Sequence, residues 1–265
     1  MGKKGIDIEQ IKSLYYQGYS PVEIGEFVGC TIANVTRRLK KSGIEFKRDY
    51  KKARHSRAGR HLLNEHYFDF IDTEDKAYFL GLLFSDGSVA RTQFYLKLTD
   101  LDILEKFKKV LDTTVPIRTI PPQKENWKQS YILEVSSTYM CSVLNSLGCT
   151  PNKTKTIRMP ELNQELARHF IRGFFDGDGC LQLQDKIYHC RFDLASASKA
   201  FLEDVRPIIA EHAKTNGHLG KEAKYDVWHL NFSGHQVIQI LDWLYKDSVF
   251  YIKRKYTKYK LLSSL

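Results

Sequence analysis

The sequence predicts an α+β fold with two similar halves, preceded by a small all-α domain and a basic connecting segment. An apolar helical segment that ends in Asp-Gly occurs twice, and the same order of alternating and helical patterns follows each copy. Before the repeat, a stretch with helical periodicity is separated from it by a run of lysines and arginines.

The N-terminal residues predict three short helices. Apolar residues recur at helical spacing at Ile8, Ile11 and Leu14, and Gly18 ends that pattern. Ser20 and Pro21 then provide an N-cap followed by proline at the first helical position. Residues 1–46 are therefore expected to form one small domain.

The segment GYSPVEIGEFVGCTIANVTRRLKKSGI resembles the helix-turn-helix of resolvase-like and phage DNA-binding proteins. The resemblance implies that the third helix enters the major groove, where amide and guanidinium groups contact base edges. A three-helix structural cap with a solvated basic face is the alternative. The outward positions of this helix are Asn34, Arg37, Arg38 and Lys41.

A basic linker is expected over residues 47–69. Its first part, KRDYKKARHSRAGRH, contains seven Lys or Arg and one acid. Such a run is either solvated or follows the phosphate backbone of a nucleic acid.

The overall charge favours a polyanionic partner, because 41 Lys and Arg exceed 31 Asp and Glu to give +10. Five cysteines without C-x-x-C spacing argue against a zinc site and a disulfide scaffold. The start MGKKGIDIEQ lacks the apolar region of a signal peptide, and no apolar run is long enough to span a membrane. These features predict a soluble intracellular protein, located in the cytoplasm.

Residues from about 70 onward contain the repeat. AYFLGLLFSDGSV (77–89) matches HFIRGFFDGDGCL (169–181), and an alternating strand pattern follows each. Next come a helix, a second strand pattern (YILEVSS and WHLNFSG) and a closing helix. The sequence thus predicts two pseudo-symmetric αββαββα units, over about 70–160 and 161–265.

The packing of the two units follows from their apolar faces. Each antiparallel sheet would place one face on its helices and leave the other polar. The two apolar helices must be buried, most simply against each other, and Gly81 and Gly173 would let their backbones approach. The helix ends would then bring Asp86 and Asp178 together beneath a saddle formed by both sheets.

FLGLLFSDG (79–87) and IRGFFDGDG (171–179) resemble the two copies of the LAGLIDADG motif of homing endonucleases. The resemblance covers the chain from about residue 70 to its end. It implies a monomeric, site-specific double-strand DNA endonuclease that uses two or three Mg²⁺ ions, for which Mn²⁺ substitutes. The eighth motif residue is the catalytic and metal-binding acid, which corresponds to Asp86 and Asp178; at the sixth position Asp176 keeps the family acid, whereas Phe84 replaces it.

The resemblance also implies catalytic lysines. CTPNKTKTIRMP resembles the segment before the second motif that supplies such a lysine, which corresponds to Lys153. In the second copy, YIKRKY near the C-terminus supplies Lys255, with Lys253 as the alternative.

The polar faces of the predicted strands are expected to contact bases in the major groove. In the first unit these residues are Gln93, Tyr95 and Lys97. In the second unit they are Gln182, Gln184, His189, Arg191, Asp193, His229 and Asn231.

The expected partner is double-stranded DNA with a long asymmetric target site, with no membrane and no obligate protein partner. Two alternatives remain open: a non-catalytic DNA-binding transcriptional regulator with the same fold, and an RNA-binding intron maturase. Splicing ends like those of inteins are not apparent, which favours a free-standing enzyme.

Overall fold

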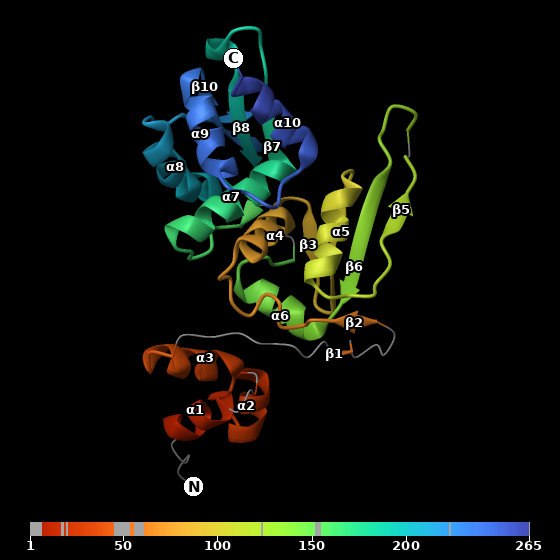
Figure 1. The fold of residues 1–265 in the computed structure, drawn as a ribbon, viewed down its shortest axis with the longest axis vertical. Coiled ribbons are helices and arrows are strands. Elements are labelled where there is room, and N and C mark those ends of the chain that lie inside the picture. The colour runs from red at the N-terminus through yellow and green to blue at the C-terminus, as the bar shows by residue number, and fades with distance from the viewer. Residues whose placement is uncertain are drawn as a thin grey trace. The chain divides into compact units, whose positions relative to one another are not determined.

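A computed structural model describes residues 7–16, 19, 21–44, 54–55, 61–122, 124–151, 155–222 and 224–264. The chain divides into two compact units, residues 1–51 and residues 52–265 (Figure 1). Within the described residues, no helix has both the length and the apolar character that crossing a membrane requires.

The first unit contains the three predicted helices, α1 (Ile8–Tyr16), α2 (Pro21–Val28) and α3 (Ile32–Lys41). Thr31 caps α3, since its hydroxyl accepts a hydrogen bond from the Asn34 N–H at 3.4 Å. Gly29 has a φ of 67° in the turn before α3, a conformation that favours glycine. The helices enclose a small core of their own, formed by Ile11, Ile24, Val35, Leu39 and Ile44.

The second unit consists of two repeats with the same element order. The first contains α4 (Glu74–Ser85), β3 (Gly87–Val89), β4 (Gln93–Leu98), α5 (Leu101–Val110), β5 (Arg118–Ile120), β6 (Ser130–Ser136) and α6 (Thr138–Ser146). The second contains α7 (Gln164–Asp178), β7 (Gly179–Gln182), β8 (Arg191–Ser196), α8 (Lys199–Ala213), β9 (His218–Glu222), β10 (Val227–Ser233) and α9 (His235–Tyr245), followed by α10 (Lys253–Leu262).

The two sheets share one topology. Their strand orders are β3-β4-β6-β5 and β7-β8-β10-β9, and every neighbouring pair is antiparallel. Alternation decides which face is buried: Phe94, Leu96 and Leu98 of β4 point into the core, whereas Gln93 and Lys97 are exposed. The α+β class and the doubled αββαββα order predicted from the sequence are therefore confirmed.

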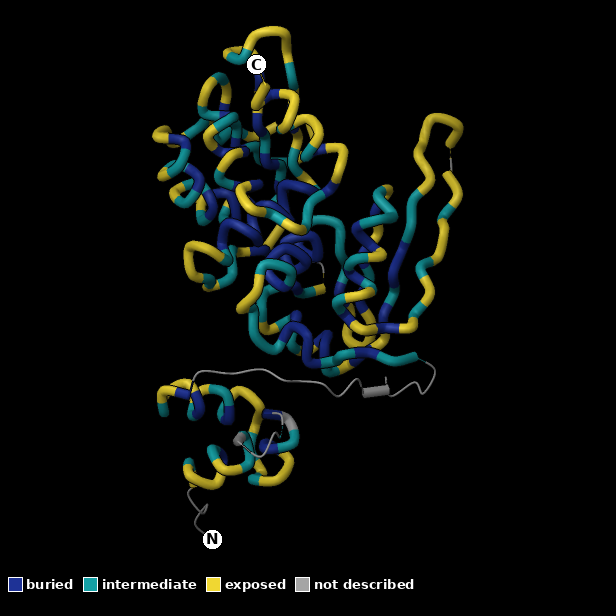
Figure 2. Tube along the Cα trace, viewed as in Figure 1, coloured by how far each residue is buried: buried dark blue, intermediate teal, exposed yellow. Residues whose placement is uncertain are grey.

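Helices α4 and α7 pack against each other at the centre of the second unit, between the two repeats (Figure 1). A Cβ atom built on Gly81 would lie 2.1 Å from the carbonyl oxygen of Phe170, and one on Gly173 would lie 2.0 Å from that of Tyr78. Tyr78 and Phe170 occupy equivalent positions of the two motifs, so the contact is symmetric. The central parts of both helices, residues 76–84 and 167–176, are buried (Figure 2).

Gly173→Ala is expected to reduce the free energy of unfolding by about 3 kcal/mol or more, because its methyl group would meet rigid backbone on α4. Chemical denaturation of the full chain measures this loss. The matched control is Gly220→Ala, whose methyl group would meet only the movable imidazole of His218. A loss for Gly173→Ala no larger than that of the control would contradict the close approach.

The segment before the repeats differs from its expected role as a linker. Strand β2 (Leu62–Leu63) pairs with β1 (Arg54–His55), and Leu63 and Phe68 are fully buried in the core of the second unit. The hydroxyl of Thr113 donates to the carbonyl of Leu62 at 2.7 Å. The packed structure therefore begins before residue 70, because burial of the apolar side chains that follow the basic run removes them from water.

Candidate active site and nucleic-acid interface

The ends of α4 and α7 bring the two motif acids into one site. Asp86 directly follows α4, and Asp178 is the last residue of α7. A Cβ atom on Gly177 would lie 2.3 Å from Oδ2 of Asp86, so the absence of a side chain there lets the two helix ends meet. The motif therefore places each aspartate at the end of its helix, and the close helix contacts at the glycines bring the two helix ends together.

The electrostatics of Asp86 reflect this proximity. Burial, followed by the negative charge of Asp178, raises the pKa of the Asp86 carboxyl to about 6. The charge of Lys255 and a hydrogen bond from the Ser85 hydroxyl act in the opposite direction. A carboxyl group whose proton affinity is raised by burial and by a second carboxylate belongs to a site that a cation would stabilise.

The donor set fits a hard divalent cation. Asp86 and Asp178 offer carboxylate oxygens, and the helix ends add backbone carbonyls, which are the ligands that Mg²⁺ prefers. Among the described residues, no group of three or more His, Cys, Asp or Glu side chains could hold a metal ion.

Lys255 reaches this site from the first turn of α10. Its buried ammonium donates to the carbonyl oxygens of Phe175, Gly179 (2.6 Å) and Gly177 (3.4 Å), which flank Asp178. Burial lowers the pKa of the Lys255 ammonium to about 8, although the charges of Asp176 and Asp86 oppose this change. The lysine therefore places a positive charge at the end of the second motif.

The sequence left Lys253 and Lys255 as alternatives, and the two side chains lie differently. Lys253 is 75% exposed and pairs with Asp102 at 3.5 Å, whereas Lys255 is buried against the end of α7. Lys153, the other predicted lysine, lies outside the described residues. The nearby Lys155 pairs with Asp226, in the turn between β9 and β10, at 2.8 Å.

Arg254 is a functional candidate that sequence reasoning missed. It lines a cleft of about 590 Å³ together with Asp86, Lys97, Trp127 and Gly177, and its Nε donates to Asp100 at 3.2 Å. The cluster YIKRKY drew attention only to its lysines, and nothing in the local pattern distinguishes an arginine that lines the cleft from one that does not.

The outer faces of both sheets carry the polar residues that were predicted to contact bases. On β4 these are Gln93, Tyr95 and Lys97. On the second sheet, a depression of about 580 Å³ is lined by Gln182, Gln184, Tyr188, His189, Arg191, His218, Asn231, Phe232 and Ser233.

Three predicted interface residues differ in their local setting. His189 and Gln184 were expected on strands, but neither lies on one. His189 lies in a short 3-10 helix, η2 (Ile187–His189), and Gln184 lies beyond the end of β7. The connection curls because the Gln184 N–H and the Cys190 thiol contact each other. His229 pairs with Asp193 across β8 and β10 at 2.9 Å.

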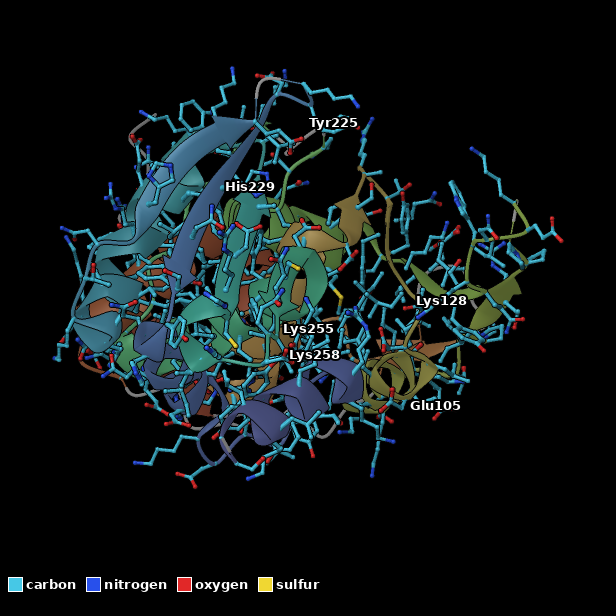
Figure 3. All side chains as sticks on the ribbon, turned by 90° about the horizontal axis from the view of Figure 1, so that it is seen from above. Glu105, Lys128, Tyr225, His229, Lys255 and Lys258 are labelled. Atoms are coloured by element: carbon cyan, nitrogen blue, oxygen red, sulfur yellow. The ribbon has the colours of Figure 1, made fainter. Side chains whose placement is uncertain are left out.

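The spatial relation of these groups can be followed in Figure 3. His229 lies on the second sheet, Lys128 lies before β6 of the first sheet, and Lys255 lies between them in this view. Lys258 lies beside Lys255 and donates to the carbonyl of Leu181 at 3.0 Å. In this view Lys255 and Lys258 therefore lie between His229 of the second sheet and Lys128 of the first repeat.

In the first unit, α3 carries the side chains that were predicted to contact DNA. Arg37 is exposed and donates to the side chain of Asn34 at 2.5 Å, whereas Arg38 is half-buried. Asn34 and Arg37 therefore form one polar patch on α3.

Comparison with known proteins gives a family match and a fold match. The sequence model of the LAGLIDADG-like domain matches residues 165–236. A probable translation initiation factor IF-2 of Thermococcus kodakarensis is 29% identical over 50% of this chain and 11% of its own length. An uncharacterised protein of Methanocaldococcus jannaschii is 27% identical over 65% of this chain and 81% of its own length.

Among solved structures, the homing endonuclease I-WcaI bound to its DNA recognition sequence matches with a TM-score of 0.50. The match has 9% identity and covers 74% of this chain and 91% of that one. Full-length DUF199/WhiA matches with a TM-score of 0.48 and 14% identity, over 76% of this chain and 66% of that one. This chain spans less than a fifth of the length of the first curated relatives that it matches.

Proposed function

Because this chain is a two-motif LAGLIDADG protein, we propose that it is a site-specific endonuclease that cuts both strands of DNA with divalent metal ions. The observation that carries the proposal is the meeting of Asp86 and Asp178 at the ends of two helices in backbone contact. A pair of neighbouring carboxylates is costly without a cation, and its placement between two polar sheet faces suits a bound nucleic acid.

In the proposed mechanism, Asp86 and Asp178 would hold the metal ions through their carboxylate oxygens. When bound, Mg²⁺ or Mn²⁺ would stabilise the negative charge that develops on the scissile phosphate. Lys255 adds a positive charge beside Asp178, where it also donates hydrogen bonds to the backbone carbonyls at the end of α7. Lys153 is proposed to serve the other active site, and Arg254 to contact a phosphate in the cleft beside Asp86.

DNA recognition is proposed to use the outer faces of both sheets. The two faces carry different side chains, so each would contact a different half of one target, which is therefore long and asymmetric. Fusion of both motifs in one chain suits a monomer. Asn34, Arg37 and Arg38 would extend the contact through the first unit.

The curated relatives support an activity of the matched segment that is independent of the larger proteins in which it occurs. The matched segments are 11–16% of an initiation factor, an RNA polymerase subunit, an aminotransferase and a ribonucleotide reductase subunit. These proteins share no activity, so the common segment is best understood as a self-contained unit. A homing endonuclease is such a unit.

A DNA-binding regulator without nuclease activity is the second candidate. The separate three-helix unit with Arg37 on its exposed face favours it, because such a unit binds DNA without metals. An RNA-binding maturase would use the same sheets on a different nucleic acid.

The decisive experiment incubates the full chain with a randomised double-stranded DNA library and Mg²⁺, in parallel with Mn²⁺. Sequencing of cut ends identifies a target, and sequencing of retained uncut DNA identifies binding without cleavage. Recurrent paired cuts at one sequence support the nuclease. Specific retention without cuts in either metal supports the regulator, and retention of RNA in preference to DNA supports the maturase.

Removal of residues 1–51 is expected to weaken DNA binding and to flatten its dependence on salt. For every phosphate that the protein no longer neutralises, the slope of log K against log salt becomes shallower by about 0.9. The second unit should fold alone, since its core is separate from that of the first unit. Affinity measured at several salt concentrations tests this expectation, and an unchanged slope would mean that the first unit binds no phosphates.

A further inference from the structure

Asp176 is a buried carboxylate that the proposed chemistry does not use. It lies on α7, two residues before Asp178, and its side chain has no exposed surface. Oδ1 accepts a hydrogen bond from the hydroxyl of Tyr245 at 2.6 Å, and Oδ2 accepts from the hydroxyl of Tyr78 at 2.8 Å and from the N–H of Ile252 at 2.8 Å. The donors come from α9, α4 and the start of α10.

The bond to Ile252 has a particular consequence for α10. Ile252 is the N-cap of this helix, and its carbonyl accepts the N–H of Lys255 at 3.0 Å. Asp176 therefore holds the residue from which the first turn of α10 begins. Lys255, one turn later, reaches back to the end of the same helix that carries Asp176.

A second buried charge on α7, that of Arg172, holds the segment that precedes α10. Arg172 is fully buried and donates to the carbonyls of Phe250 and Leu244, each at 2.9 Å. Its remaining nitrogen pairs with Glu74 of α4 at 2.6 Å. Arg172 and Asp176 lie one helical turn apart, so one face of α7 fixes the chain that leads into α10.

The other repeat shows that the helix crossing itself does not require an acid at this position. Phe84 occupies the equivalent site in α4 and packs edge-on against Phe170, with ring centroids 5.1 Å apart. Burying a carboxylate costs free energy that an aromatic ring does not. The acid in the second repeat is therefore explained by what it holds rather than by packing of the two helices.

We infer that Asp176 is a positioning residue for Lys255: through the N–H of Ile252 it sets where α10 begins and so holds the lysine ammonium at the end of the second motif. The consequence for DNA cleavage rests on the proposed function. The positioning itself does not, because it concerns contacts within the free protein.

Chemical protection of Lys255 tests the positioning without metal or DNA. Asp176→Leu and Asp176→Asn should each increase the rate at which an acylating reagent modifies Lys255 by roughly tenfold or more, because opening of α10 exposes the amine. Mass spectrometry of the modified full chain measures the rate, with exposed Lys97 as the internal reference. Amide hydrogen exchange should rise over residues 252–256 and stay unchanged within α7.

Ile252→Pro provides the same test from the donor side. It removes the N–H that Asp176 accepts, at a φ of −82° that proline can adopt, and leaves the carboxylate in place. Tyr245→Phe is the matched control, because it removes another donor to Asp176 and keeps the Ile252 bond. Faster modification of Lys255 in Ile252→Pro than in Tyr245→Phe supports the inference. Protection equal to wild type in folded Asp176→Leu and Ile252→Pro would overturn it.

Strand-specific cleavage extends the test if the wild-type chain cuts DNA. Asp176→Asn should slow the cutting of one strand on the order of 10²-fold, the same strand that Lys255→Met affects, with unchanged DNA affinity. The double variant should be no slower than Lys255→Met alone, because both changes remove one interaction. Additive losses, or equal losses on both strands, would overturn the link to Lys255. Absence of cleavage by the wild type would refute the proposed function and leave the protection test valid.

Discussion

Asp86→Asn and Asp178→Asn are each expected to reduce DNA cleavage by about 10³-fold or more while DNA affinity stays within a few-fold of wild type. An amide cannot supply the negative charge that holds a divalent cation, whereas binding depends on phosphate and base contacts elsewhere. Cleavage of a plasmid that carries the target, together with affinity in Ca²⁺ or without metal, measures both quantities. A variant that cuts at the wild-type rate in Mg²⁺ would contradict the assignment of that aspartate.

Stability measurements separate this loss of chemistry from damage to the fold. The pKa of Asp86 is raised to about 6 from 3.8, so its charged form is less favourable in the folded than in the unfolded chain. The folded state therefore loses stability as the pH rises from about 4 through 6, and an amide at this position avoids that loss. Asp86→Asn should raise the melting temperature of the metal-free protein at pH 8.

The matched control is Asp112→Asn. Asp112 is exposed and has a φ of 48°, a conformation that asparagine tolerates equally well. We expect both cleavage and melting temperature to stay unchanged in this variant. A lower melting temperature for Asp86→Asn would indicate that its carboxylate has a favourable partner in the metal-free protein.

Lys255→Met is expected to produce a predominantly nicked DNA intermediate. Loss of a charge-stabilising group costs on the order of 10²–10³ in rate, and the hydrogen bonds of the Lys255 ammonium go to the end of the second motif. One strand should therefore be cut much more slowly than the other. Lys153→Met is expected to produce the complementary nick, on the strand that Lys255→Met leaves unaffected.

A supercoiled plasmid followed through nicked and linear forms measures the two cuts, and end-labelling identifies the strand. Lys253→Met is the control, because Lys253 lies two residues away on the same helix but is exposed and paired with Asp102. It should cut both strands at the wild-type rate. Equal slowing of both strand cuts in Lys255→Met and in Lys153→Met would contradict the proposed lysine roles. It would leave the assignment of the aspartates unchanged.

The architecture was predictable because its signals are local and repeated. Alternation such as Gln93 to Leu98 marks a strand with one buried face, and a glycine in the middle of an apolar helix marks a close helix contact. Duplication of the whole pattern then leaves few ways to bury both apolar helices. The meeting of Asp86 and Asp178 follows from that packing.

What the sequence did not reveal depends on contacts between distant segments. Lys253 and Lys255 are both basic residues in one basic cluster, and only the position of α10 against α7 distinguishes them. The same holds for Arg254 and Asp176, because the role of each side chain depends on contacts with residues far away in the chain. The packing of Leu63 and Phe68 was hidden because a basic run precedes them.

The backbone contact at Gly81 and Gly173 has a consequence for how such a protein could change its target. The contact ties both acids to one rigid pair of helices, while the side chains that are proposed to face DNA lie on separate strands. In a nuclease built this way, the offset between the two cuts, and hence the length of the single-stranded overhang, is set by the helix pair. Substitutions at Gln93, Lys97 or Arg191 could then alter sequence preference one half-site at a time without altering the shape of the cut ends.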